Sequence, residues 1–169
     1  MKPAVALAFV AFAVAGLSTA ARADPSGASA TAEVTGFYDR FATAFRNKDL
    51  SGIMSLYVHD DSLFAFDVSP PHEYVGWTAY RADWRDLFAS FRGPVHFTIA
   101  ELGITVSGDV AYTHSLQHVS GKSSDGKYEH LVIRVTDVLR KFGDRWLIVQ
   151  QHVSVPIYAD SGEADWDSK

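Results

Sequence analysis

The sequence contains no cysteine among its 169 residues. Disulfide bonds, thiolate metal sites and cysteine nucleophiles are therefore excluded, and an apolar core must stabilise the fold instead. Aromatic residues are abundant, at 13% of the chain, which suits such a core. The same abundance also suits a domain that encloses an apolar cavity, and both interpretations are open at this point.

Basic residues are few as well. Lys and Arg number 15 against 20 Asp and Glu, which gives a net charge of −5, and no basic cluster occurs. Nucleic acids need positively charged surfaces, so we expect no nucleic-acid partner. The chain also lacks a phosphate-binding loop, a dinucleotide-binding glycine pattern and metal-ligand spacing. We therefore expect neither a metal nor a cofactor.

One long apolar run lies at the N-terminus. Residues 4–17 carry no charge, follow the positive Lys2 and precede residues 21–23, an A-x-A cleavage pattern. These features are typical of a secretory signal peptide, and the run is too short for a membrane span. We predict a signal peptide over residues 1–23, cleaved after Ala23. The mature protein is then periplasmic or secreted and has no membrane span.

Three amphipathic segments follow a short polar stretch, residues 24–32, which we expect to be a flexible tether. Apolar residues repeat at helical spacing over residues 31–48, over residues 49–57 and over residues 77–91. Gly93–Pro94 ends the last of these patterns. The spacing predicts three helices whose apolar faces pack inward.

The remaining segments show the period-two alternation of strands. They are residues 62–68, 95–107, 110–120 and the two halves of residues 128–156. Gly143–Asp144 separates those two halves and is typical of a hairpin turn.

The order of these elements indicates an α+β fold, because the helices come first and the long antiparallel strands come last. We expect a cone-shaped, curved antiparallel or mixed sheet that wraps around three N-terminal helices and leaves a cavity for a small molecule. A single domain is predicted over residues 33–157, followed by an acidic tail over residues 158–169.

Three stretches resemble the nuclear transport factor 2-like superfamily. Residues 41–53 (FATAFRNKDLSGI) and 60–67 (DDSLFAFD) look like segments of ketosteroid isomerases, which belong to it. Residues 134–140 (RVTDVLR) look more like SnoaL-like proteins and the association domain of calcium/calmodulin-dependent protein kinase II. The resemblance covers roughly residues 34–156. It implies a cystatin-like α+β barrel, a fold that carries enzymes and non-enzymes alike.

The resemblance also implies roles for individual residues. Asp67 matches the general base of the isomerase, and Asp137 matches the acid that donates to its oxyanion. Phe41 matches a tyrosine that is the second oxyanion donor; phenylalanine cannot donate, and losing one such donor typically lowers the rate by about 10²–10³. His114 matches a basic pocket residue of the kinase association domain, and Tyr80 matches a position beside that pocket.

Asp137 is also singled out by its position in the strand pattern. It shares the parity of Leu131, Ile133 and Val135, the side of the strand expected to face inward. A buried carboxylate is costly unless it is hydrogen-bonded, paired or functional. Asp137 is therefore either an acid that faces the pocket or one partner of a salt bridge with a nearby arginine or histidine.

The other candidate site residues also have two interpretations, one functional and one structural. Asp67 is either a general base at the mouth of the cavity or a residue that ends its strand. His114 is expected to be a polar pocket residue; on a strand it lies about 13 Å from His118, too far to share one metal. The residues expected to line the ligand site are Phe41, Tyr57, Phe66, Tyr80 and Trp84. Ordinary core packing is the alternative for the tyrosines and the tryptophan.

Three functions are consistent with this pattern. The first is an exported domain that binds a mostly apolar small molecule, with its polar end met by His114, Asp137 and Tyr80. The second is an isomerase, cyclase or dehydratase that moves a proton next to a carbonyl, with Asp67 or His114 as the base. The third is an assembly module. Relatives often dimerise through the outer sheet face, so we expect a homodimer there, with Trp146, Ile148 and His152 in the interface.

Overall fold

The computed structural model describes residues 25–167. The predicted signal peptide over residues 1–23 lies outside this range. Three helices are present, α1 (Pro25–Arg46), α2 (Leu50–Met54) and α3 (Trp77–Ser90). Six strands complete the fold: β1 (Phe64–Phe66), β2 (Tyr74–Val75), β3 (Phe91–Ser107), β4 (Val110–Ser123), β5 (Tyr128–Phe142) and β6 (Arg145–Ser154).

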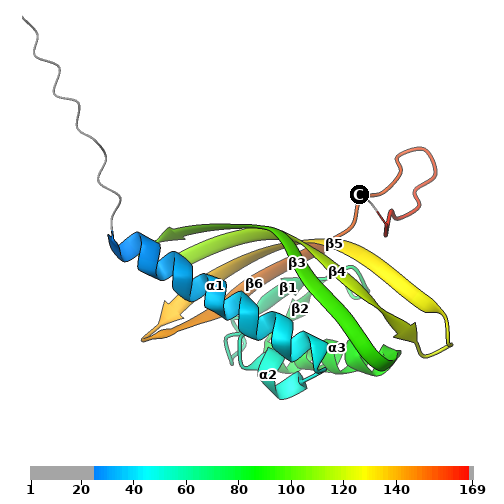
Figure 1. The fold of residues 1–169 in the computed structure, drawn as a ribbon, viewed down its shortest axis with the longest axis horizontal. Coiled ribbons are helices and arrows are strands. Elements are labelled where there is room, and N and C mark those ends of the chain that lie inside the picture. Colours follow the sequence, from blue (N-terminus) through cyan, green and yellow to red (C-terminus); the bar gives the residue numbers. More distant parts are fainter. Residues whose placement is uncertain (1–24, 168–169) are drawn as a thin grey trace, which may run out of the picture.

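The strands form one curved sheet in the order β2-β1-β6-β5-β4-β3, and α1 lies across its concave side (Figure 1). All neighbouring strands are antiparallel except β1 and β6, which are parallel. Among the described strands the sheet does not close into a barrel, since β2 and β3 remain at its two edges. The predicted α+β class with a curved mixed sheet around the helices is therefore confirmed.

The first helix begins earlier than the sequence pattern suggested. It starts at Pro25, so residues 25–32, expected as part of a tether, are helical. Proline is well tolerated at the first helical position because that N–H has no partner within the helix. The short α2 is capped as expected by Asp49, whose carboxylate accepts a hydrogen bond from Gly52 N at 2.9 Å.

Aromatic packing fixes α1 and α3 against the sheet. Phe37, Phe41 and Phe45 recur along one face of α1, and all three are buried. The ring of Phe45 stacks on Phe97 of β3 with centroids 4.1 Å apart and meets Trp84 of α3 edge-on at 5.7 Å. Edge-on and offset pairs of this kind stabilise a core beyond the area they bury. The helices are thus held at fixed positions over the concave side.

A β-bulge reverses the parity of β6. Val138 pairs with Gln150 whereas Leu139 pairs with Ile148, so Val149 is the extra residue on the bulged strand. Before the bulge Trp146 and Ile148 face the core, and after it Gln151 and Val153 do.

This parity corrects part of the expected dimer interface. Trp146 and Ile148 belong to the core and cannot form the outer face, whereas His152 does lie on that face.

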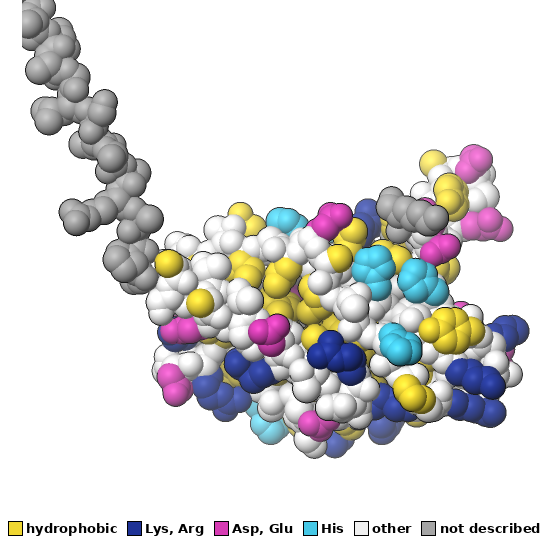
Figure 2. All heavy atoms as spheres, viewed as in Figure 1, with side chains coloured by type: hydrophobic (Ala, Val, Ile, Leu, Met, Phe, Trp, Pro, Cys, Tyr) yellow, Lys and Arg dark blue, Asp and Glu magenta, His cyan; other side chains and the backbone are white. Residues whose placement is uncertain are grey.

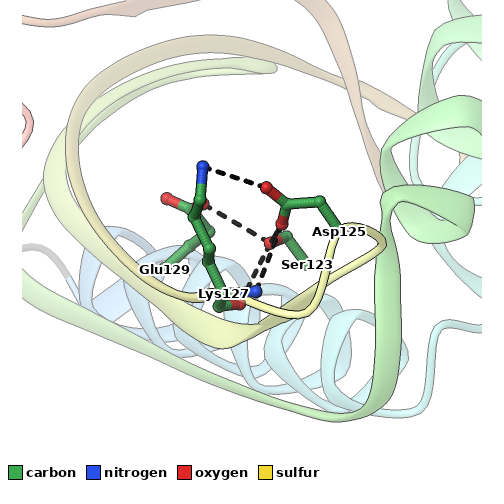
Figure 3. A network of polar contacts seen from close by, with 4 residues as sticks. All are labelled: Ser123, Asp125, Lys127 and Glu129. Atoms are coloured by element: carbon green, nitrogen blue, oxygen red, sulfur yellow. Dashed lines mark hydrogen bonds and ion pairs between the residues drawn. The ribbon is translucent and has the colours of Figure 1, made fainter.

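The β4–β5 hairpin is closed by a small polar network (Figure 3). Ser123 Oγ lies 2.6 Å from Asp125 Oδ1, and Lys127 Nζ lies 3.1 Å from the other carboxylate oxygen. Lys127 O accepts hydrogen bonds from Ser123 N and Oγ, and Gly126 adopts φ 94° in the turn. These contacts hold the register of β4 and β5, and the ladder between them continues unbroken from the turn into the concave wall.

The described part of the acidic tail beyond β6 folds back toward the sheet (Figure 1). Ile157 and Ala164 form an antiparallel bridge, and Trp166 O accepts a hydrogen bond from Val132 N of β5 at 2.8 Å. The side chain of Asp167 meets His130 Nδ1 at 3.0 Å. The tail therefore covers the part of the β5 edge that β6 does not pair with.

Candidate functional site

A cavity of about 630 Å³ lies between α1, α3 and the concave side of β4–β6. This volume is within the range of small-molecule sites, about 300–1,000 Å³. Its interior is largely apolar and includes Phe41, Phe45, Trp84, Leu87, Val119, Leu131, Ile133 and Val153. Its mouth, the part lined by Asp67, Tyr74, Asp83 and Asp86, is only partly shielded from solvent. The arrangement suits a mostly apolar molecule with a polar group near the entrance.

The polar centre of the cavity wall is Gln151. Its Oε1 accepts hydrogen bonds from the hydroxyls of Tyr57 at 2.9 Å and Tyr80 at 2.5 Å. Its Nε2 donates to Asp137 Oδ1 at 2.8 Å. This orientation of the side-chain amide suits all three contacts, because Oε1 accepts from the two hydroxyls while Nε2 donates to the carboxylate.

Asp137 lies behind this glutamine and is fully engaged by the protein. Its Oδ2 accepts from Tyr38 OH at 2.7 Å, and that hydroxyl also lies 2.5 Å from Thr113 Oγ1. The carboxyl group is 1% exposed, and the loss of hydration raises its pKa to about 6, although the hydrogen bonds from Tyr38 and Gln151 act in the opposite direction.

The inward orientation predicted for Asp137 is thus correct, but the residue is not part of the cavity wall. Both carboxylate oxygens already accept hydrogen bonds, so Asp137 is placed to orient Gln151 and Tyr38 and not to donate to a ligand. Within residues 25–167 it also takes part in no salt bridge, which was the alternative interpretation.

Asp67 does line the cavity. Burial raises its pKa to about 6, and the nearby charge of Asp83 adds to the effect. Its Oδ2 lies 3.2 Å from the hydroxyl of Tyr80, which is closer to Gln151 Oε1. A tyrosine hydroxyl has one proton, so while Tyr80 donates to Gln151 its oxygen can accept a hydrogen bond from neutral Asp67. The protonation state of Asp67 is therefore linked to the hydrogen bonds around Gln151.

Trp84 contributes a buried hydrogen-bond donor that makes no well-formed hydrogen bond among the described residues, although the Tyr57 hydroxyl is near enough for the indole to act on the pKa of Tyr57. The residue lines the cavity and is 6% exposed, and Nε1 has no hydrogen-bond partner among the described residues. A buried indole N–H normally has a partner, because leaving it unpaired costs free energy. An acceptor atom on a bound molecule would satisfy it.

The expected aromatic lining is only partly present. Phe41, Tyr80 and Trp84 line the cavity, whereas Tyr57 lies behind it and reaches the site only through its hydroxyl on Gln151. Phe66 is on the opposite face of the sheet, 37% exposed, with its ring against His152 at a centroid distance of 5.4 Å. The prediction that Phe66 lines the ligand site is wrong, because Ala65 takes the inward position on this short strand.

His114 is not a pocket residue either. It is exposed on the outer face, where its imidazole covers Gly103 of the neighbouring strand. The inward positions of β4 belong to Thr113, Ser115 and Gln117, all buried. Polar side chains therefore occupy the inner face of this strand, and the pocket role that the resemblance implied for His114 does not carry over to this chain.

Four residues of the site were not anticipated. Tyr38 could have been found, since it lies one turn before Phe41 on the same helical face. Gln151 faces inward only because of the bulge. Asp83 lines the cavity because of the way α3 is oriented relative to it. Trp166 reaches the cavity from the folded-back tail, for which the sequence contains no periodic signal.

None of the helices between residues 25 and 167 combines the length and the apolar character needed to cross a membrane. In the same part of the chain no group of three His, Asp or Glu side chains is arranged to hold a metal ion.

Comparison with known proteins places the fold. A protein of unknown function from Pseudomonas putida KT2440 that is nuclear transport factor 2-like shares 28% identity, covering 84% of this chain and 97% of that one, with a TM-score of 0.75. A ketosteroid isomerase-like protein from Erwinia carotovora atroseptica SCRI1043 shares 18% identity, over 73% and 93%, with a TM-score of 0.61.

A structure from Thiobacillus denitrificans ATCC 25259 that is named for the calcium/calmodulin-dependent protein kinase type II association domain shares 21% identity. It covers 73% of this chain and 94% of its own, with a TM-score of 0.56. No curated protein matches the chain. The SnoaL-like domain model matches residues 34–158, most of the sequence. These residues contain α2, α3, the curved sheet, most of α1 and all of the cavity lining except Trp166. The chain is therefore a member of the SnoaL-like domain family, within the nuclear transport factor 2-like fold.

Proposed function

We propose that this protein binds a small, mostly apolar molecule in the cavity between α1, α3 and the sheet. The observation that carries the proposal is a largely apolar cavity of about 630 Å³ whose wall includes Trp84, a residue with a buried Nε1 that makes no well-formed hydrogen bond among the described residues. A core that existed only for stability would gain by filling the space and pairing the donor. An exported location is the expectation that accompanies this function, and detection of the mature N-terminus near Asp24 would test it.

Thermal unfolding in the presence of candidate ligands tests the binding proposal. Steroids, aromatic acids, aromatic amines and polyketide-like phenols cover the relevant shapes. A ligand at 100 times its Kd adds about 2.7 kcal/mol of stability, which corresponds to a rise in Tm of several degrees for a domain of this size. Absence of stabilisation by every class would contradict the proposal.

A matched pair of variants ties any binding to the cavity. Ile133→Trp places a large ring into the space, so it should abolish the ligand-induced rise in Tm. Leu116→Trp adds the same ring on the neighbouring strand, where the side chain points to the opposite face and is partly exposed. It should leave the rise unchanged. Equal effects of the two substitutions would show that the ligand binds elsewhere.

Proton transfer next to a carbonyl is a second candidate, and Asp67 is the observation that favours it. Its carboxyl lines the cavity, and its pKa of about 6 is suited to a general base near neutral pH. Trp84 Nε1 offers a donor for the carbonyl oxygen in place of Asp137. The family resemblance to a ketosteroid isomerase-like protein agrees with this chemistry.

Deuterium incorporation tests this second candidate directly. The protein is incubated in D₂O with a cyclic β,γ-unsaturated ketone, and exchange at the carbon next to the carbonyl is followed by NMR. Asp67→Asn should remove the exchange, because the amide cannot accept the proton, whereas Asp39→Asn on the exposed side of α1 should not. Exchange no faster than in buffer would leave binding as the function.

A further inference from the structure

The charges around the cavity are all of one sign. Of its described lining residues, Asp67, Asp83 and Asp86 are acidic, and none is Lys, Arg or His. Asp86 has a partner, because Arg85 lies 2.9 Å from it and both side chains are exposed. No basic side chain among the described residues forms a salt bridge with Asp67 or Asp83. The entrance therefore contains two acidic groups whose charge the protein does not neutralise.

These two groups are in an unfavourable setting without a counter-ion. Both are partly buried, and the loss of hydration raises the pKa of each, with the charge of Asp83 acting on Asp67 in the same direction. Tyr74 OH donates to Asp83 at 2.6 Å, and Tyr80 OH lies 3.2 Å from Asp67. Hydroxyl groups stabilise a carboxylate but supply no positive charge. A cation bound between the two would relieve the repulsion.

The aromatic side chains nearby fit such a cation. Tyr74, Tyr80, Trp84 and Trp166 all line the same cavity. Aromatic faces attract an ammonium group, and this attraction grows where water is excluded. An anionic ligand, in contrast, would meet two carboxylates and no basic side chain, so carboxylic and phosphorylated compounds are disfavoured.

We infer that the ligand of this cavity is an apolar amine, bound as its ammonium ion between Asp67 and Asp83. The apolar part of the molecule occupies the space against Phe41 and Phe45, and an oxygen atom in it accepts a hydrogen bond from Trp84 Nε1. This inference rests on the proposed binding function and narrows it to one chemical class.

A series of three probes with one aromatic body tests the charge preference. They are 2-(1-naphthyl)ethylamine, 2-(1-naphthyl)ethanol and 3-(1-naphthyl)propionate, titrated into the protein by isothermal calorimetry at pH 7.5. The amine should bind about tenfold more tightly than the alcohol, a factor that a single partly shielded charge pair can supply. The carboxylate should bind most weakly, and added salt should reduce the difference between amine and alcohol.

Two substitutions locate the charge that is responsible. Asp67→Asn and Asp83→Asn keep the size of each side chain and should each weaken binding of the amine about fivefold, while leaving the alcohol within about twofold. Asp39→Asn, an exposed acid on α1 outside this cavity, is the matched control and should change neither affinity. Tm and circular dichroism of each variant show that the fold is retained.

The possible results separate the two levels of the proposal. Equal affinity for amine and alcohol, or tightest binding of the carboxylate, would overturn the amine assignment and leave a binding cavity. Binding of the amine that survives both Asp→Asn substitutions would overturn it as well. If none of the three probes binds and the ligand classes named for the thermal screen also fail, the binding function itself is overturned.

Discussion

Gln151 and Asp137 lie directly opposite each other on β6 and β5, and Gln151 Nε2 donates to Asp137 Oδ1 over 2.8 Å. This contact joins two parts of the molecule that the sequence keeps apart. On one side it reaches Tyr38 of α1, and on the other it reaches Tyr57 and Tyr80 beside the cavity. The chain of hydrogen bonds therefore connects the inner core to the wall of the ligand site.

The first prediction concerns that glutamine. Gln151→Leu removes the partner of two tyrosine hydroxyls and of Asp137, and each buried polar group left unpaired costs about 1–3 kcal/mol. We expect a loss of about 3 kcal/mol in the free energy of unfolding measured with urea, since Tyr80 can turn to Asp67. Gln150→Leu is the control, because this neighbour is exposed and should change stability by less than about 0.5 kcal/mol. Similar values for the two variants would contradict the network.

The second prediction is a pH dependence of stability. The pKa of Asp137 is about 6 in the folded protein against 3.8 as the ordinary value, so the folded state holds the proton more tightly. Stability should therefore fall as pH rises from about 4 to about 6 and then level off. The shift corresponds to about 3 kcal/mol as an order of magnitude. Asp67, whose pKa is raised in the same sense, adds to the fall.

Asp137→Asn is the variant that checks this assignment. Its amide can accept from Gln151 Nε2 and donate to Tyr38 OH, which then donates to Thr113 Oγ1, so the fold is retained. Urea unfolding of the variant between pH 4 and pH 7 should show a much smaller slope, with the remainder due to Asp67. An unchanged slope would show that Asp137 does not titrate in this range.

The third prediction concerns the tail as part of the cavity. Trp166→Ala removes a side chain that lines the cavity, and we expect naphthylethylamine to bind about threefold more weakly because apolar contact area is lost. Tyr158→Ala removes another exposed aromatic residue of the same tail that does not line the cavity, and affinity should be unchanged. Calorimetry on both variants provides the comparison. Equal effects would mean that the tail acts only through overall stability.

The fourth prediction is the oligomeric state. We expect a homodimer through the outer face of the sheet, where Phe66, Tyr112 and His152 are exposed. Tyr112→Glu should then shift the mass measured by light scattering from that of a dimer toward that of a monomer. The control is Arg92→Glu, at an exposed residue. Lys141 is not used for this purpose, because it forms an ion pair with Glu33. A monomeric wild-type protein would contradict the expectation.

Much of the fold could be predicted, because apolar residues recur with a clear period in helices and strands that bury only one face. The helical spacing of Phe37, Phe41 and Phe45 and the alternation of β5 both survive in the structure, and the latter placed Asp137 on the inner face. Asp67 was also placed correctly at the cavity. In each of these cases a single local pattern determines which side of the element is buried.

The errors arose where local pattern does not determine the buried side. In β4 the inner residues are Thr113, Ser115 and Gln117, so His114, which the family resemblance assigned to the pocket, lies on the outer face. In β6 the extra residue Val149 reverses the parity halfway along the strand, which hid Gln151. Bulges and polar inner faces depend on pairing with distant strands, and a pattern within one strand does not record that pairing.

A group of histidine side chains lies close to the acidic tail that follows β6. Histidine side chains gather beside the sheet, and acidic ones lie on the loop of the tail (Figure 2). His96, His118 and His130 border one shallow hollow, and the contact between His130 and Asp167 links this group to the tail. The tail is therefore held by its side chains as well as by its backbone.

The short length of β6 has a consequence for the behaviour of the protein at high concentration. β6 ends at Ser154, opposite Arg134, and beyond that point the folded-back tail satisfies the N–H of Val132. Proteolytic cleavage anywhere between Ile157 and Trp166 would free the end of the tail and leave the edge of β5 around Val132 unpaired. Bare strand edges recruit further chains by edge-to-edge addition, so a nicked preparation should form aggregates while the intact protein stays in solution.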